Sequence, residues 1–341
     1  MYLNVFMSNN IKCFSKDEIY NRFKLGLNLS ELKALEILDE KKTFIALVIL
    51  YLTTALLIFV SIKLTYYNFL FYIPCIFLIA GRQGAFVQLV HEASHFLVSK
   101  NNKLNDFFGN YLCAFPIGVN FAGFRSGHNN HHVNTATPND SPTDLDKYKV
   151  VDTKKFDLYK LFIKDLVGIS ALEVFLSYGK NKTETVNIEK KSKKEFFLTL
   201  TKLSLTQLFI LALFGFNIIN YILFWIIPLI SPHMFLMRIR GLAEHGQSNQ
   251  LGCTAETNSA GTFYTRSFLT EVNSYKSAIV VFLEKILIGS FNVNFHHEHH
   301  IFPNIPWYNL KKLSKLISKN VQKNNSSTTY RKGYVEAAFI N

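Results

Sequence analysis

Nine of the eleven histidines fall into a spaced pattern that could bind metal ions. His91 and His95 lie in H-E-A-S-H, and His245 lies alone in G-L-A-E-H-G. The motifs H-N-N-H-H and H-H-E-H-H contribute three histidines each: His128, His131 and His132, then His296, His299 and His300. A neutral imidazole is a good ligand for iron, zinc or copper. Nine such nitrogens divide naturally between two metal ions, with four or five ligands each.

The spacing within each motif predicts that these imidazoles point to one side of a helix. Positions i, i+3 and i+4 span roughly 100° of arc on an α-helix. His297 lies about 100° from His296, so we exclude it as a ligand. His233 lies alone near a proline and is expected to be a packing or boundary residue. Three glutamates adjoin the ligands and are expected to orient their second ring nitrogens: Glu92, Glu244 and Glu298.

Two other kinds of metal protein compete with a two-metal enzyme. H-E-A-S-H fits the zinc protease pattern H-E-x-x-H, in which the glutamate activates water. A catalytic zinc takes three protein ligands, which would leave about six clustered histidines without a role. A metal transporter would be expected to carry ionisable residues within its spans, and these offer little beyond Arg82 and Lys202. The histidine surplus therefore favours two metals, with the membrane zinc protease as the alternative from another class.

Composition favours a membrane protein. Of the 341 residues, 49% are hydrophobic, and they come in long unbroken blocks. The net charge of +13 fits Lys and Arg in cytoplasmic segments, and no arginine-and-aromatic motif predicts a nucleic-acid partner. The four cysteines are far apart and predict neither a disulfide framework nor a thiolate metal site. Polar residues precede the first apolar run, so no cleaved signal peptide is expected.

The apolar runs predict an all-α membrane fold with four transmembrane helices and a cytosolic, histidine-rich catalytic cap. The spans are expected at about 43–62, 69–90, 197–216 and 218–237. A turn around Lys63 and Tyr66 should join the first two, and Pro228 and Pro232 should kink the last. Both termini and every candidate ligand are expected in the cytoplasm, because the short connections carry only Lys63 among basic residues.

The rest of the chain divides by polarity. We expect a cytosolic N-terminal segment at 1–42, a membrane domain at 43–317, a charged linker at 178–195 and a polar, weakly structured tail at 318–341. In the first segment, Ser30 could cap a helix with Leu32, Leu35 and Leu38 on its apolar face. Residues 104–124 are apolar but broken by Gly109, Pro116 and Gly118. These breaks predict a re-entrant or interfacial segment whose backbone groups need partners.

The three motifs, in this order and with spans between the first pair and the third, resemble the histidine boxes of the membrane fatty acid desaturase superfamily. The stretch NVNFHHEHHIFPNIPWYNL resembles the third-box region over many residues, and the resemblance covers about residues 40–315. It implies four spans, a cytosolic di-iron centre and O₂-dependent attack on an acyl chain. The implied box ligands are His91, His95, His128, His131, His132, His296, His299 and His300, and His245 matches the extra histidine after the fourth span.

Two features depart from related branches. Gly241 stands where the acyl-CoA branch has an asparagine that meets the metal through water. The His-Pro-Gly-Gly signature of a fused heme-binding domain is absent from the sequence, so electrons are expected from an external donor of the ferredoxin or cytochrome-b type.

The expected cofactors are two iron ions (Fe²⁺/Fe³⁺), with O₂ as co-substrate and a lipid or acyl chain as substrate. No catalytic residue beyond the metal ligands is expected. Removing two hydrogens from unactivated C–H bonds needs O₂ reduced at a metal with two external electrons, and a nitrogen-rich, thiolate-free site suits iron. Desaturation is therefore the favoured reaction. Hydroxylation by the same oxidant is the close alternative, because oxygen transfer to the carbon gives an alcohol instead.

Overall fold

The computed structural model describes most of the hydrophobic part of the chain. The described residues are 27–135, 140, 155–177, 193–245, 267–268, 277–321, 330–331 and 333–339. Their regular secondary structure is helical apart from a two-residue parallel pair, in which β1 (Ser267–Phe268) pairs with β2 (Tyr330–Arg331). Most of the expected N-terminal segment, most of the charged linker, and Cys13 and Cys253 lie outside these residues.

Three stretches of the described chain are long and apolar enough to cross a membrane. They are Glu40–Tyr67, Phe69–Ser94 and Ile218–His245. The fourth predicted span corresponds to α10 (Lys193–Leu213), whose apolar part, Phe197–Leu213, is shorter. This helix ends before residue 216 because Gly215 and Phe216 adopt positive φ angles of 63° and 58°. The all-helical prediction is therefore confirmed, and three of the four expected spans meet the length of a membrane crossing.

The first two long helices form a hairpin whose turn is later than expected. α3 (Glu40–Tyr67) runs without a break through Lys63 and Tyr66, so the turn predicted there is wrong. The chain turns at Asn68, which has extended dihedrals and whose side chain accepts a hydrogen bond from the Leu70 N–H. This capping bond satisfies the start of a short 3₁₀ turn, η2 (Phe69–Phe71), that leads into α4 (Tyr72–Ser94).

The last long stretch is broken as its prolines predict. It comprises α11 (Ile218–Tyr221), the π-helical η5 (Ile222–Ile226), α12 (Ile227–Ile230) and α13 (Pro232–His245). Ser231, directly before Pro232, leaves the helical region with φ −121° and ψ −91°. A proline disfavours the helical conformation of the residue before it, so the kink lies where the sequence places it.

The segment between the second span and the second histidine motif is irregular. It runs through α5 (Asn102–Phe107), the π-helical η3 (Phe108–Ala114) and η4 (Phe115–Ile117), and then turns at Gly118 with φ 71°. Polar side chains from distant helices donate to its free carbonyls. Tyr51 Oη lies 2.8 Å from the Leu112 oxygen, and Gln207 Nε2 lies 2.7 and 2.9 Å from the Phe115 and Pro116 oxygens. Such partners are what non-helical backbone at membrane depth requires.

The polar interruption in α4 is explained by close helix packing. A Cβ at Gly81 would lie 2.5 Å from the Ile286 oxygen, so only glycine lets α14 (Ala278–Leu287) approach this closely. Arg82 Nη2 donates to the same Ile286 oxygen at 3.1 Å. Gln83 Nε2 donates to the Trp225 oxygen at 2.7 Å, which ties α4 to η5. The helix therefore continues through these residues toward His91, as the sequence predicts.

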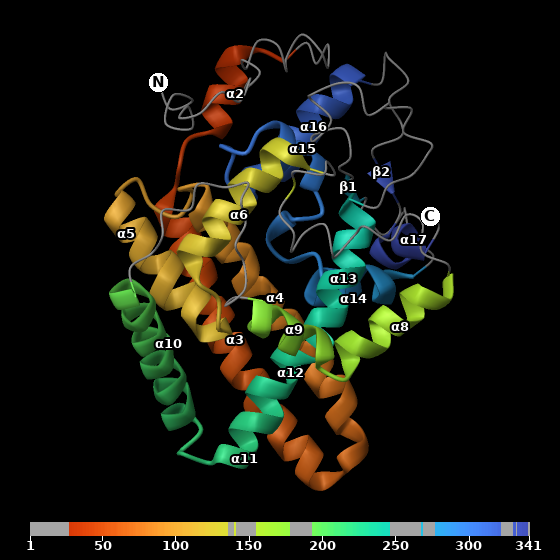
Figure 1. Ribbon diagram of the computed structural model, residues 1–341. Helices are drawn as coiled ribbons and strands as arrows, with labels where there is room; N and C mark the ends of the chain where they lie inside the picture. The colour runs from red at the N-terminus through yellow and green to blue at the C-terminus, as the bar shows by residue number, and fades with distance from the viewer. Residues whose placement is uncertain are drawn as a thin grey trace.

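Both ends of the described chain pack on the histidine-bearing end of the molecule. α2 (Leu29–Leu35) is capped by the Asn28 side chain rather than by Ser30, and its buried residues Leu32 and Leu35 join a cluster with α16 (Leu310–Val321). Within the predicted weakly structured tail, α17 (Tyr334–Phe339) packs on α13, with Tyr334 fully buried. Figure 1 shows α6, α15 and α16 at one end of the molecule and α11 at the opposite end.

Candidate metal centre

Four elements bring the nine predicted ligands together. His91 lies in the last turn of α4, and His95 is its C-terminal cap. α6 (Phe121–Asn134) carries the H-N-N-H-H motif, and α15 (His296–Ile301) carries H-H-E-H-H. His245 is the last residue of α13. The structure thus gathers side chains from positions 91 to 300 at one end of the helices.

The first group contains five histidines, which we call the five-histidine group: His91, His95, His128, His132 and His299. One ring nitrogen from each lies within 4.8 Å of the others. The ring centroid of His95 lies 4.7–5.0 Å from the other four. The pairs His91–His132 and His128–His299 are farther apart, at 6.4 Å each. The rings therefore form a square pyramid with His95 at its apex.

The second group contains four histidines, which we call the four-histidine group: His131, His245, His296 and His300. Their ring nitrogens also lie within 4.8 Å of one another, and all four side chains are buried. The His245 ring centroid lies 4.6 Å from those of both His131 and His296. The two groups are adjacent, since the His132 and His300 rings stack at 4.1 Å.

The two groups share their supporting helices. On α6, residues four apart in sequence, His128 and His132, join the five-histidine group, whereas His131 joins the other. On α15 the assignment reverses, with His296 and His300 in the four-histidine group and His299 in the five-histidine group. The sequence predicts that each triplet faces one way, and the structure adds that each triplet contributes to both groups.

The nitrogen positions suit metal ions better than hydrogen bonds. His128 Nε2 lies 2.9 Å from both His95 Nε2 and His132 Nε2, yet one ring nitrogen has a single proton or a single lone pair to offer. Among the described residues, His300 has no hydrogen-bond partner for either of its buried ring nitrogens. Metal–imidazole bonds of about 2.1 Å at right angles put neighbouring nitrogens about 3.0 Å apart. The contacts match that spacing, so the residues fit two metal ions.

Burial keeps these imidazoles in the form that binds metal. It lowers the pKa of His95 to about 3, with a smaller contribution from the nearby Arg125 guanidinium. Burial is also the main cause that lowers the pKa well below its usual range for His128, His132, His296, His299 and His300. At neutral pH these six rings are therefore neutral, each with a free lone pair that can bind a metal.

Carboxylates support both groups from outside. Glu92 Oε1 lies 3.7 Å from His91 Nδ1, and its other oxygen accepts the Trp307 N–H at 3.0 Å. Glu244 Oε2 lies 3.6 Å from His296 Nε2. Glu298, the third predicted glutamate, is buried with 1% of its surface exposed.

Asp140 is the residue that sequence reasoning missed. Its carboxylate oxygens lie 3.0 and 3.2 Å from His131 Nδ1, and both side chains are buried. A carboxylate on the second nitrogen fixes the orientation of a ligating ring. The available signal was an acidic residue shortly after H-N-N-H-H, the one box whose sequence contains no glutamate.

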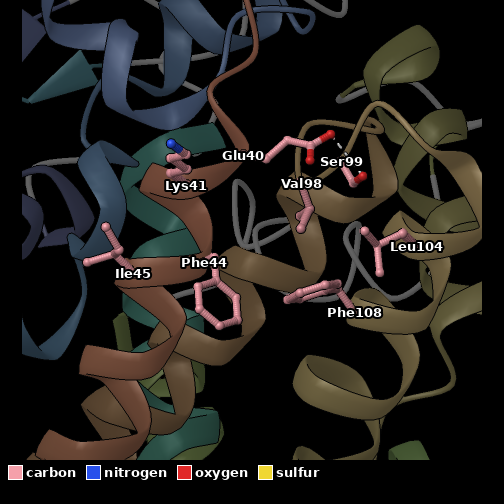
Figure 2. Close-up of a pocket in the computed structure, with 8 residues that line it drawn as sticks. All are labelled: Glu40, Lys41, Phe44, Ile45, Val98, Ser99, Leu104 and Phe108. Carbon is pink, nitrogen blue, oxygen red and sulfur yellow. Dashed lines mark hydrogen bonds between the residues drawn. The ribbon is translucent and has the colours of Figure 1, made fainter.

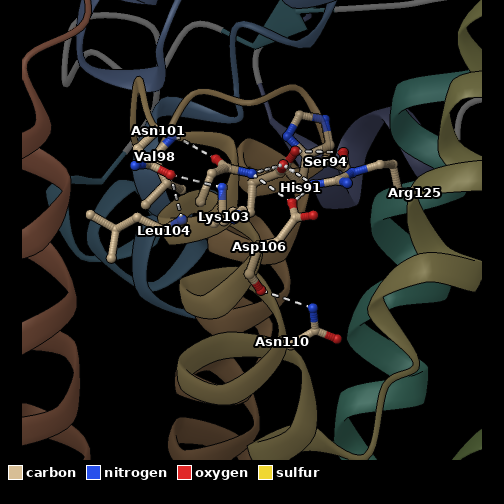
Figure 3. Close-up of polar contacts among 11 residues, drawn as sticks. His91, Ser94, Val98, Asn101, Lys103, Leu104, Asp106, Asn110 and Arg125 are labelled. Atoms are coloured by element: carbon tan, nitrogen blue, oxygen red, sulfur yellow. Dashed lines mark hydrogen bonds and ion pairs between the residues drawn. The ribbon is translucent and has the colours of Figure 1, made fainter. Parts of the chain in front are cut away.

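The end of α4 is held by a polar network that sets the direction of His95. Phe96 has a positive φ of 60°, which turns the chain away from the helix. Arg125 Nη2 donates to the Ala93 oxygen at 3.0 Å and to Asp106 Oδ1 at 2.5 Å, and its guanidinium stacks 4.2 Å from the Phe96 ring centroid. Figure 3 shows Arg125 reaching from α6 to Asp106 of α5 and to the end of α4. The α6 residue Arg125 thus joins the first box to the second.

The two histidines excluded from the ligand set lie outside both groups. His297 and His233 are each 7% exposed, so burial alone does not separate them from the nine. Within the described part of the chain, neither belongs to a set of ring nitrogens that converge. His233 lies beside Gly84, near the Pro232 kink, which fits a packing role.

An apolar groove of about 420 Å³ lies beside the chain segment that follows His95, and none of the nine predicted ligands lines it. Its walls come from the start of α3 and from the chain after His95, including Phe44, Ile45, Val98 and Phe108. At its mouth Glu40 accepts a hydrogen bond from Ser99 Oγ at 3.0 Å (Figure 2). Val98 follows His95 by three residues, so the groove borders the segment that carries this ligand.

Comparison with known proteins agrees with the histidine pattern. A model of the fatty acid desaturase family matches residues 67–332. Dihydrorhizobitoxine desaturase from Bradyrhizobium elkanii is 25% identical over 250 residues, which cover 71% of this chain and 66% of that protein. The chloroplastic omega-6 fatty acid desaturases of Brassica napus and Arabidopsis thaliana are each 23% identical over 256 residues, or 72% of this chain.

The match to these relatives is partial in length. The chain spans 54% of the Brassica protein and 53% of the Arabidopsis protein, so it corresponds to about half of the plant enzymes and just under two thirds of the bacterial one. The family model covers most of this chain, including all three histidine motifs and His245. Together with the three long apolar helices, this match identifies the chain as a membrane protein that belongs to the fatty acid desaturase family.

Proposed function

We propose that the chain is an O₂-dependent di-iron oxidoreductase that introduces a double bond into a lipid acyl chain, with electrons from an external ferredoxin or cytochrome-b-type donor. The observation that carries this proposal is the convergence of nine imidazoles in two adjacent groups of five and four. When bound, two irons supply the redox chemistry that reduces O₂ and removes hydrogen from C–H bonds. The overall balance is one O₂, two electrons, two protons and two substrate hydrogens giving two waters.

The protein's own residues hold, orient and shield this chemistry. The five-histidine group and the four-histidine group are the ligand sets, and Asp140 and Glu92 orient His131 and His91 from outside. The four-histidine group is buried, and such burial would shield a reactive oxidant from water and from side reactions. The groove lined by Phe44 and Phe108 offers apolar surface to an acyl chain next to the segment of His95.

The protease alternative gains little support from this geometry. His91 and His95 of the H-E-A-S-H motif converge with three further histidines, whereas a catalytic zinc keeps three protein ligands and an open position. Glu92, which would have to activate water, accepts the Trp307 N–H with one oxygen and faces His91 with the other. We infer a four-span topology with α10 as the third crossing, and both termini and the metal centre in the cytoplasm.

The direct test combines metal analysis with product analysis. Purified protein should contain two irons per chain, and lipids of cells that express it should gain double bonds detectable by mass spectrometry. His131→Ala and His299→Ala, one from each group, should abolish the product while the protein still inserts, and His297→Ala is the matched control. New hydroxyl groups in place of double bonds would assign the hydroxylase reaction. One zinc and no iron would reject the proposal and favour the protease.

A further inference from the structure

A buried side chain at the start of α17 contacts Glu244, which adjoins the four-histidine group. Tyr334, the first residue of α17, is fully buried, and its hydroxyl donates to Glu244 Oε1 at 3.3 Å. These two residues are 90 positions apart in sequence. A buried tyrosine needs a partner for its hydroxyl, and a backbone carbonyl is the common choice. Here the partner is a carboxylate beside two candidate ligands.

Glu244 is held on the edge of the four-histidine group from three directions. Arg240, one turn earlier on α13, places its Nε 2.9 Å from both carboxylate oxygens. Tyr334 holds Oε1, and Oε2 lies 3.6 Å from His296 Nε2, the nitrogen that also faces His245 Nε2 at 2.8 Å. The negative charge therefore lies next to the nitrogens that converge, and its neighbours fix where it points.

The four-histidine group has the greater need for such a neighbour. It has one imidazole fewer than the five-histidine group, so a metal ion there would receive one nitrogen donor fewer. A fixed anion nearby stabilises a divalent ion in a buried site, and interactions just outside the ligands commonly tune metal affinity. The five-histidine group has a different carboxylate, Glu92, which is held by the Trp307 N–H instead.

We propose that Tyr334 is a positioning residue of the four-histidine group: its hydroxyl aims the Glu244 carboxylate at His296, and α17 thereby sets how tightly this group holds its metal. This inference rests on the proposed function, because it takes both groups to bind iron. In this proposal α17, which lies in the segment predicted to be a weakly structured tail, contributes to the metal centre.

Tyr334→Phe separates this role from packing. The phenylalanine keeps the ring that fills the cluster with Ala80, Leu242 and Ile288. A second tie keeps α17 in place, because the Val335 N–H donates to Glu284 Oε1 at 3.3 Å. Tyr72→Phe is the matched control, since Tyr72 is also buried and its hydroxyl donates to the Leu223 carbonyl at 3.1 Å, away from the histidines.

The experiment follows iron release from the purified holoenzyme in the presence of a ferrous chelator. In wild type both irons should be retained, whereas Tyr334→Phe should release one of its two irons about 10-fold faster or more and keep the other. Only one of the two Mössbauer iron signals should change. The melting temperature of the metal-free protein should match that of Tyr72→Phe. Glu244→Gln, which keeps the side-chain volume, should produce the same selective loss.

Two results would overturn the inference. Unchanged release of both irons in Tyr334→Phe would show that the hydroxyl does not act on the metal. Equal acceleration of both irons with a lower melting temperature would assign Tyr334 to packing alone. A wild-type protein that binds no iron would instead reject the proposed function, and this inference with it.

Discussion

His245 and His297 have similar neighbours in sequence and differ in their relation to the two groups. Both are buried and both adjoin a glutamate, but His245 Nε2 faces His296 Nε2 at 2.8 Å, and His297 lies outside both groups. We expect His245→Ala to lose iron from the four-histidine group together with oxidation activity, because one of four ligands is missing. His297→Ala should keep two irons. Metal content per chain, measured by mass spectrometry of the purified variants, checks both.

The reverse pattern of iron loss would contradict the ligand assignment. An essential His297 with a dispensable His245 would mean that α15 does not present its histidines as a helix does, and the ligand set would have to be redrawn.

Asp140 makes a second prediction at this scale. Its carboxylate fixes the ring of His131 through Nδ1, so Asp140→Ala leaves that ligand free to rotate. We expect about 10–100-fold weaker iron affinity in the four-histidine group, measured by titration with a chelator of known affinity. Glu173→Ala, which removes an exposed carboxylate paired with Lys164, is the control and should retain iron as wild type does. Wild-type affinity in Asp140→Ala would remove Asp140 from the centre.

The nine candidate ligands could be predicted from sequence, but their division into a group of five and a group of four could not. Helical spacing identifies which residues of a motif share a side, and in the structure His296 joins the four-histidine group whereas His297 joins neither group. Whether His131 joins His128 or His245 depends on how α6, α13 and α15 meet, which is tertiary packing. Asp140 escaped prediction because no periodic pattern links it to a ring nine positions away.

At the scale of elements, two glycines on α4 look alike in sequence and differ in space. A Cβ at Gly81 would meet backbone atoms of α14 at 2.5 and 2.9 Å, whereas at Gly84 the nearest atom is the flexible end of Met237 at 3.4 Å. We expect Gly81→Ala to destabilise the protein by about 1–3 kcal/mol, because two helices must separate. Gly84→Ala should change stability by less than about 1 kcal/mol. Thermal unfolding in detergent measures both, and equal effects would contradict the close packing.

Helix ends were harder to predict than helices. Apolar length correctly indicates α3, α4 and the stretch from α11 to α13, and the prolines locate the kink before α13. The turn at Asn68 was missed because Lys63 interrupts the apolar run and thereby predicts the end of the helix. A lysine near the end of an apolar helix can remain helical, since its aliphatic stem packs on apolar surface while its charge reaches water. The start of α2 depends on which of two neighbouring polar residues, Asn28 or Ser30, accepts the capping bond. Which residue caps a helix depends on small differences in local geometry, and the periodic pattern of apolar residues does not contain them.

At the scale of the whole molecule, the charge distribution predicts an orientation. Lys100 lies near the histidine end, where its N–H donates to Glu40 at the start of α3, and Lys63 lies near the other end of α3. In a cysteine-free background, we expect Lys63→Cys to react with a membrane-impermeant maleimide in intact cells and Lys100→Cys to react only after lysis. Both positions are exposed, so reactivity reports the side of the membrane. The reverse pattern would invert the proposed topology.

The irregular segment 108–117 also constrains how the protein is made. Its carbonyls at Phe115 and Pro116 find their partners in Gln207, 92 residues after Phe115, and in Trp225, 109 residues after Pro116. At about 5–20 residues per second of translation, these partners emerge roughly 5–20 s after the segment itself. During that delay its backbone groups would be unpaired in lipid, so the segment has to wait in a hydrated place, at the membrane surface or within the insertion machinery. The segment can take its final position only after α10 and the stretch beginning at α11 have been inserted. The segments of this protein are therefore not inserted strictly in the order of the sequence.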